Sequence, residues 1–350
     1  MLTDRHKIII KAWIFGVFIA LAVCWIIGAN FLSDIFVWEK CPELDLFVKA
    51  PGVHMHTSEG WSKTHFGKYG FMAIPDVKSI PGPILEVWGS SHVEGFQVDD
   101  QYKLQSQINA CLKHNPHLAN ITAVAIAHSD WKVGSYLDAI PTYEKFLCPS
   151  CHIIVLTNWN NFQNCRNYKN LNPRETHKKK NLIRLRKILY KLKLGFAFNI
   201  AVKWVRKSLP HIRFGPGTAS SPNQDNLNPI LAPPLQEWAF ALEQFKQVTK
   251  LPVIFLYSPA IPTLEHGRIV TQDPYHDWAL QFELLCYKFH FGFINVTDNN
   301  NKYFQEYGKF PRGFHNGKLA KGHSNKAAYS IMAHALCAYL EKHQHDIYSN

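Results

Sequence analysis

Five short apolar runs that alternate with helical patterns constrain the fold more than any other feature of this sequence. Each run is continuous, which is typical of a strand buried on both faces. Strands that alternate with helices are joined by right-handed crossovers in a parallel sheet. Strands are expected at 84–88, 121–127, 152–157, 252–257 and 291–294, and helices near 100–114, 134–147, 234–249, 276–290 and 326–342. The sequence therefore predicts an α/β fold, a layered sandwich around a parallel sheet of about five strands.

An uncharged apolar run, residues 12–32, precedes this pattern. A helix of about 20 apolar residues crosses the hydrocarbon core of a bilayer. The run is longer than the apolar region of a cleaved signal peptide, which favours a permanent anchor. The flanking charges are Arg5, Lys7 and Lys11 before the run, and Asp34, Glu39 and Lys40 after it. The positive-inside rule then places the N-terminus in the cytoplasm and the following domain outside the cytoplasmic membrane, in a periplasmic or extracellular position.

The chain divides into three parts. Residues 1–33 are expected to form a cytoplasmic tail and a single transmembrane helix. Residues 34–83 have no clear period and read as a linker or N-terminal extension. Residues 84–345 are expected to form the α/β domain, interrupted by a basic insertion at 166–214.

The net charge of +12 is concentrated in that insertion. Between Arg166 and Arg213 there are 15 Lys and Arg residues and one acid, while the rest of the chain has 23 basic and 25 acidic residues. Basic residues interleaved with Leu, Ile, Phe and Trp at helical spacing indicate amphipathic helices at a membrane interface. The candidate contacts with a membrane or partner are Lys178, Lys179, Lys180, Arg184, Arg186 and Lys187. A solvated helical hairpin is the alternative, and the predicted compartment argues against nucleic acid as a partner.

A serine follows the first predicted strand at a tight turn, Gly89-Ser90-Ser91. Ligand sites of parallel sheets lie at the carboxyl ends of the strands, and a serine at such a turn has backbone N–H groups beside it that can hold an oxyanion. Such a turn alone is more often structural than catalytic. His323, in the loop entering the last helix, adds the general base that a serine hydroxyl needs.

Three motifs together resemble the SGNH (GDSL-type) hydrolase and acyltransferase superfamily over roughly residues 84–342. They are Gly89-Ser90-Ser91-His92-Val93-Glu94-Gly95, Thr157-Asn158-Trp159-Asn160-Asn161 and Gly322-His323-Ser324-Asn325. The chain is most similar to the membrane-anchored, envelope-facing branch that works beside polysaccharide or teichoic-acid acylation systems. The resemblance implies a flavodoxin-like three-layer fold, Ser91 as nucleophile and His323 as base. It further implies an oxyanion held by Asn160 and the N–H of Ser91, and it implies no cofactor.

The motifs depart from the family pattern at three positions. Ser90 stands where the first motif usually has Asp. Asp130 stands where the family has a glycine, so that its backbone N–H is the corresponding oxyanion donor. Ala320 replaces the acid that usually comes three residues before the histidine, and Asp298 is the nearest upstream acid to nominate in its place.

The resemblance predicts a serine esterase or O-acyl(acetyl)transferase that acts on cell-envelope carbohydrate through an acyl-enzyme. The expected partners are membrane lipid, an acylated or acyl-accepting carbohydrate, and, as a candidate, a membrane-embedded acyltransferase. The missing acid keeps open an alternative, a non-catalytic relative that binds glycan or such an acyltransferase.

Two further patterns are assigned no chemistry. His92, His128 and His315 are among 19 histidines, so a loose grouping is expected by chance and no metal site is predicted. Cys148 and Cys151 form a C-P-S-C pair without a second C-x-x-C, which favours a structural or incidental role over a zinc or redox role.

Overall fold

A five-stranded parallel sheet is the centre of the structure, a computed structural model that describes residues 4–31, 36–57, 59–163, 165, 177–208 and 233–344. The strand order is β11-β8-β7-β5-β6. The bounds are Ile84–Gly89 for β5, Thr122–Ala127 for β6, Cys151–Leu156 for β7, Val253–Tyr257 for β8 and Gly292–Asn295 for β11. Counted along the chain, this is the 2-1-3-4-5 order of flavodoxin-like sheets. The predicted fold class is confirmed.

Neighbouring residues on each strand pack into opposite halves of the core. Trp88 lies in one hydrophobic cluster and Val87 in the other, and both are fully buried. Ile154 and Ile153 of β7 divide in the same way. Because both faces of the sheet are covered, the strands have no polar side to alternate with, which explains the continuous apolar runs of the sequence.

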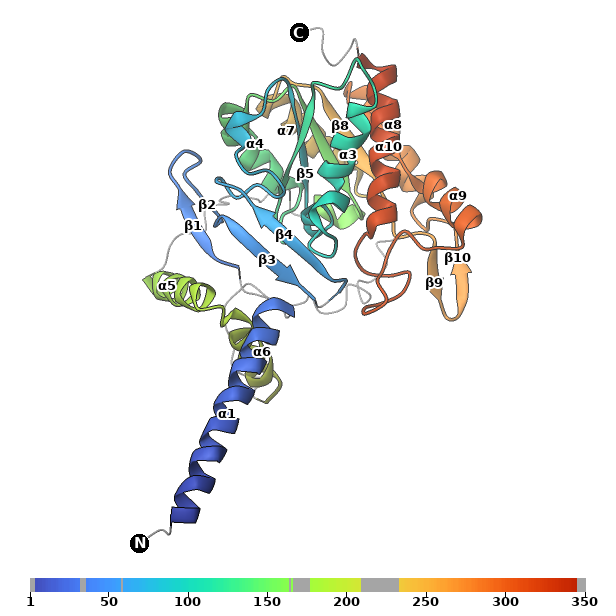
Figure 1. Ribbon diagram of the computed structural model, residues 1–350. Coiled ribbons are helices and arrows are strands. Elements are labelled where there is room, and N and C mark those ends of the chain that lie inside the picture. The colour runs from blue at the N-terminus through green and yellow to red at the C-terminus, as the bar shows by residue number, and fades with distance from the viewer. Residues whose placement is uncertain are drawn as a thin grey trace.

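Helices form the two outer layers (Figure 1). One layer consists of α4 (Val133–Leu147), α7 (Leu235–Val248) and α8 (His276–Lys288), whose buried side chains join the cluster of Trp88. The other consists of α3 (Leu104–Lys113) and α10 (Lys326–Lys342), which pack against each other and on the cluster of Val87. These five helices are the predicted ones. Helix α9 (Thr297–Tyr307) and the small hairpin of β9 (Thr263–Glu265) and β10 (Arg268–Val270) are additions that the sequence pattern did not reveal.

The segment before the sheet is more ordered than a linker. It forms two antiparallel hairpins, β1 (Trp38–Cys41) with β2 (Leu46–Lys49), and β3 (Gly52–His56) with β4 (Ser62–Phe66). Leu44 and Val48 are buried in the cluster of Trp88, and Phe66 in that of Val87. Strands of four or five residues are too short to show a clear period in sequence, yet these hairpins are part of the domain.

The first helix, α1 (Asp4–Phe31), projects away from the domain (Figure 1). Residues Arg5–Ala29 are long and apolar enough to cross a membrane, and they are almost entirely exposed in the structure. Two insertion helices follow, α5 (His177–Lys191) and α6 (Gly195–Ser208). Helix α5 lies below the β1–β2 hairpin, and α6 lies beside the upper part of α1 and contacts it (Figure 1).

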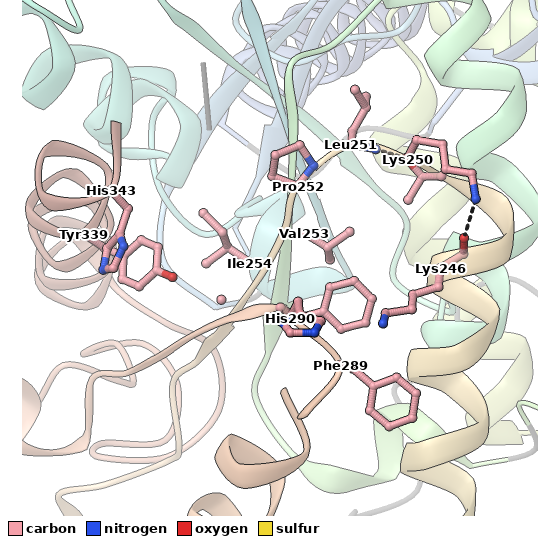
Figure 2. A pocket seen from close by; sticks show the side chains of 13 residues that line it. Lys246, Lys250, Leu251, Pro252, Val253, Ile254, Phe289, His290, Tyr339 and His343 are labelled. Atoms are coloured by element: carbon pink, nitrogen blue, oxygen red, sulfur yellow. Dashed lines mark hydrogen bonds between the residues drawn. The ribbon is translucent and has the colours of Figure 1, made fainter. Parts of the chain in front are cut away.

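A hollow of about 550 Å³ opens at the amino ends of β8 and β11 (Figure 2). Val253, Ile254 and Gly292 line it together with Lys246, Lys250 and His290. Ser91 follows the carboxyl end of β5. Because the strands are parallel, the hollow lies at the opposite edge of the sheet and is separate from the site described next.

Candidate active site

Ser91 is the first residue of a short helix, α2 (Ser91–Glu94), that begins two residues after β5 ends. Ser90 caps this helix through its backbone alone, since its side chain makes no capping hydrogen bond. The turn closes on Gly95, which adopts a left-handed conformation. The backbone N–H of a first helical residue has no partner within its helix. Ser91 is half-buried at this edge of the sheet.

His323 connects the serine to a carboxylate. Its Nε2 lies 3.1 Å from Ser91 Oγ, and its Nδ1 lies 2.5 Å from Glu59 Oε2. The other carboxylate oxygen, Glu59 Oε1, accepts the backbone N–H of His323 at 3.0 Å. An ionised Glu59 accepts a proton-bearing Nδ1, which leaves the Nε2 lone pair directed at the serine hydroxyl. Glu59, His323 and Ser91 therefore have the connectivity of an acid–base–nucleophile triad.

Glu59 lies in the connection between β3 and β4, and a second loop holds this connection in place. Asn316 Oδ1 accepts the N–H of Gly60 at 2.7 Å, while its Nδ2 donates to Gly60 O at 3.1 Å and to Thr57 O at 3.3 Å. Gly322 has a φ of +82°, and a Cβ built on it would overlap Glu59 Oε1. The carboxylate thus fits a slot that exists only because position 322 lacks a side chain.

The electrostatics of the pair favour an ionised acid. Burial alone would raise the pKa of the Glu59 carboxyl, but the hydrogen bonds and charge of His323 outweigh this and hold the pKa below its ordinary value. A carboxylate that keeps its charge fixes the imidazole tautomer and stabilises the imidazolium formed during proton transfer.

The prediction that Asp298 is the acid beside His323 is wrong. Asp298 lies exposed in the first turn of α9, and the carboxylate at His323 Nδ1 is that of Glu59. Ala320, where the family has its acid, is fully buried and its carbonyl accepts the hydroxyl of Thr263 at 3.0 Å. Glu59 precedes His323 by 264 residues in sequence. No local motif marks Glu59, and only the packing of the β3–β4 hairpin brings it to the site.

Asn160 lies in a 3-10 turn, η3 (Trp159–Phe162), which follows β7. Because β7 pairs with β5, this turn is at the same sheet edge as Ser91. Lys132 Nζ donates to Gln163 Oε1 at 3.2 Å, and Gln163 Nε2 donates to Asn160 Oδ1 at 3.0 Å. Since a lysine only donates, this series of hydrogen bonds fixes the orientation of both amides, with Oδ1 of Asn160 as the accepting atom.

Asp130 does not fulfil its predicted role. Its backbone N–H donates to His128 Nδ1 at 3.3 Å, and the residue is exposed. A donor already engaged by a neighbouring imidazole is not directed at a developing oxyanion. The loop after β6 therefore adds no oxyanion donor through this residue.

The three histidines for which no metal site was predicted have separate surroundings. His92 Nδ1 accepts the backbone N–H of Ser324 at 3.3 Å and lies 3.1 Å from Ser324 Oγ, and burial holds its pKa well below the ordinary value. His128 lies against Trp38 and Trp131, and His315 is exposed. A neutral His92 joins the serine turn to the histidine loop and places no positive charge beside His323.

A buried ion pair stabilises the short helix that begins at Ser91. Lys49 of β2 is paired with Glu94, the last residue of α2, and both side chains are buried. Ser129 Oγ also donates to Glu94. The ammonium lies between aromatic rings, 4.4 Å from the centre of Phe96 and 5.1 Å from that of Phe36. The first hairpin thus supplies the counter-charge for the helix that presents the nucleophile.

The remaining sequence assignments concern the cysteines and the basic insertion. Cys148 and Cys151 are free thiols, the first exposed and the second fully buried in β7. Arg184 is exposed, whereas Arg186 and Lys187 are half-buried, and burial lowers the pKa of Arg186. Lys178, Lys179 and Lys180 belong to α5, but their side chains lie outside the described part of the chain.

No protein-family model and no curated protein sequence matches this chain. Among solved structures it is similar to LAE5, an alpha/beta hydrolase from the metagenome of Lake Arreo, Spain, at 12% identity and a TM-score of 0.39, over 75% of this chain and 97% of that one. It is also similar to a catalytic mutant of Axe2, an acetylxylan esterase from Geobacillus stearothermophilus, at 12% identity and a TM-score of 0.41, over 75% of this chain and 94% of that one. A third similar structure is TesA, at 10% identity and a TM-score of 0.38, over 74% of this chain and 98% of that one. The roles of the side chains in this chain follow from the geometry of its own site.

Proposed function

We propose that this chain is a membrane-anchored serine esterase or O-acyl(acetyl)transferase that acts on cell-envelope carbohydrate. The observation that carries the proposal is the continuous hydrogen-bonded line from Glu59 through His323 to Ser91. The alternative, a non-catalytic binding protein, was motivated by the acid missing at position 320. Glu59 supplies that acid, which favours the enzyme.

The reaction begins when Ser91 Oγ attacks the carbonyl carbon of an ester and its proton passes to His323 Nε2. The carbonyl oxygen becomes an oxyanion, which the N–H of Ser91 and the Nδ2 of Asn160 stabilise as donors. When the tetrahedral intermediate collapses, the bond to the leaving alcohol breaks and the imidazolium returns the proton to that alcohol. An acyl-enzyme on Ser91 is left.

Deacylation repeats these steps with a second nucleophile. Water gives hydrolysis, and a sugar hydroxyl gives transfer. In either case His323 accepts the proton of the incoming hydroxyl and returns it to Ser91 Oγ. Glu59 keeps its charge throughout and stabilises the transient imidazolium.

The location is proposed from α1 and the charges around it. A span of 25 residues, Arg5–Ala29, with basic residues at its start, favours a cytoplasmic N-terminus and a catalytic domain on the outer side of the cytoplasmic membrane. The acylated or acyl-accepting carbohydrate would then be met at the membrane surface, where a membrane-embedded acyltransferase is a candidate partner.

The test uses the full chain in detergent with 4-nitrophenyl acetate as substrate. Ser91→Ala is expected to lower kcat by about three orders of magnitude or more, because it removes the nucleophile. Ser90→Ala is the matched control and should keep most activity, since the Ser90 side chain makes no capping hydrogen bond. Mass spectrometry after reaction with a fluorophosphonate should place the adduct on Ser91. Equal turnover by wild type and Ser91→Ala would exclude the enzyme.

A further inference from the structure

The basic insertion touches the anchor helix. Trp25 Nε1 of α1 donates to the carbonyl of Leu192 at 3.2 Å. The ring of Phe196, at the start of α6, lies so close to Gly28 that a Cβ there would overlap it. Both contacts are near the last residues of the apolar span, Arg5–Ala29. Because the catalytic domain follows that end, α6 is packed at the level where the span leaves the hydrocarbon core.

The same insertion touches the hairpin that carries Glu59. The hydroxyl of Tyr190, in α5, makes two hydrogen bonds with Val53 of β3. It accepts the N–H of Val53 at 3.2 Å and donates to Val53 O at 3.1 Å. Through α5 and α6 the outer end of α1 is therefore connected to the strand that leads into the catalytic acid.

On both sides of these two attachments the insertion exposes large apolar side chains. Their exposed fractions are 45% for Leu185, 55% for Ile188, 54% for Leu192, 54% for Ile200 and 66% for Trp204. Exposed basic residues accompany them, namely Arg184, Lys191 and Lys193. Apolar and aromatic side chains beside a cationic surface are typical of helices that lie in a membrane interface.

We propose that α5 and α6 form an interfacial platform, residues 177–208, that lies in the headgroup layer of the bilayer that holds α1. This rests on the anchor proposed above. The lipid bilayer is the occupant that fits, because the apolar surface of α6 is continuous with that of α1 at Phe196 and Gly28. Tryptophan is enriched at this depth, and lysine and arginine attract anionic headgroups. The platform then fixes the height of the β3–β4 hairpin, and of Glu59, above the membrane.

The experiment introduces a photoreactive benzoyl-phenylalanine in the full chain, reconstituted in vesicles of phosphatidylcholine and phosphatidylglycerol. It replaces one residue at a time: Ile188 or Trp204 in the platform, Ile19 in α1, or Leu284 in α8. Leu284 is the matched control, since it is 70% exposed and apolar but belongs to the outer helix layer. Phospholipid adducts are expected from Ile188, Trp204 and Ile19, severalfold above the yield from Leu284.

The outcomes separate the platform from the anchor. Adducts at Ile19 with only background yield at Ile188 and Trp204 would overturn the platform and leave the anchor in place. Background yield at Ile19 would overturn both. Changing Arg184, Lys191 and Lys193 to Gln should lower the adduct yield at Ile188 in anionic vesicles, and an unchanged yield would contradict the role of the headgroup charge. Esterase activity is not part of the readout, so a failure of the proposed chemistry is detected independently.

Discussion

Glu59 and His323 are brought together from distant parts of the chain. The carboxylate contacts both the Nδ1 and the backbone N–H of the histidine, so it orients the ring and the loop that carries it. Such a two-point contact controls the imidazole tautomer more firmly than a backbone carbonyl would. The catalytic importance of the acid is therefore expected to be large.

Replacing Glu59 by Gln tests this expectation, because it exchanges one carboxylate oxygen for an amide nitrogen. Glu59→Gln keeps the size of the side chain but removes its charge, and kcat for an acetyl ester is expected to fall by about a hundredfold to ten-thousandfold. Asp298→Asn is the matched control, because Asp298 is an exposed acid on α9, and it should leave kcat unchanged. Steady-state kinetics of both variants would decide. A larger loss in Asp298→Asn than in Glu59→Gln would reverse the assignment of the acid.

The depressed pKa of Glu59 also predicts how stability depends on pH. Its ordinary value is 4.5, and the folded value is lower. The folded state thus holds the proton less tightly than the unfolded state, and the charge stabilises the fold above about pH 4.5. This stabilisation is lost as pH falls through the lower, folded pKa. Melting curves should therefore show a difference between wild type and Glu59→Gln at pH 7 that shrinks as the pH falls below 4.5 and through the folded pKa. A difference that stays constant with pH would contradict this prediction.

At the scale of elements, the site depends on two loops that meet at Gly322. Gly322→Ala would place a methyl group against Glu59 Oε1 and strain a left-handed backbone. A displaced carboxylate is expected to lower kcat by about a hundredfold. Gly308→Ala is the control, because Gly308 has a φ of +63° but open space around it. It should lower the melting temperature through backbone strain and leave kcat unchanged. An equal loss of kcat in both variants would contradict the claim that Gly322 makes room for the Glu59 carboxylate.

The elements that the sequence predicts best are those with a continuous apolar run or a clear amphipathic spacing. The five sheet strands and the five helices of the outer layers follow from continuous apolar runs and amphipathic spacing. Ser91 and His323 could be predicted for the same reason, since each lies directly beside such an element. Glu59 could not, because the hairpin of β3 and β4 is short, and its position depends on contacts such as those of Asn316 with Gly60. Asp130 was mispredicted because the partner of its N–H is His128, a tertiary detail of one loop.

At the scale of the whole molecule, the N-terminal hairpins connect α1, the hydrophobic core and the site. Their buried side chains complete both hydrophobic clusters. The second hairpin carries the acid, and the first supplies Lys49 to the helix of the nucleophile. An extension with these contacts folds as part of the α/β domain. We expect its removal to unfold the site, because Glu59 and part of both hydrophobic clusters would be lost with it.

The ion pair between Lys49 and Glu94 allows that integration to be measured. Lys49→Met keeps the apolar stem but leaves Glu94 as a buried charge without its counter-ion, and the expected loss is about 3–5 kcal/mol of unfolding free energy. Lys40→Met is the matched control in the same hairpin. Lys40 pairs with Asp45 at 2.8 Å, but their side chains are 60% and 79% exposed, so the loss should stay within about 1 kcal/mol. Denaturant titrations of the full chain in detergent would give both values. Similar small losses of unfolding free energy in both variants would mean that the first hairpin contributes little to the stability of the domain. A large loss for Lys49→Met alone would establish that this hairpin is part of the domain's cooperative fold.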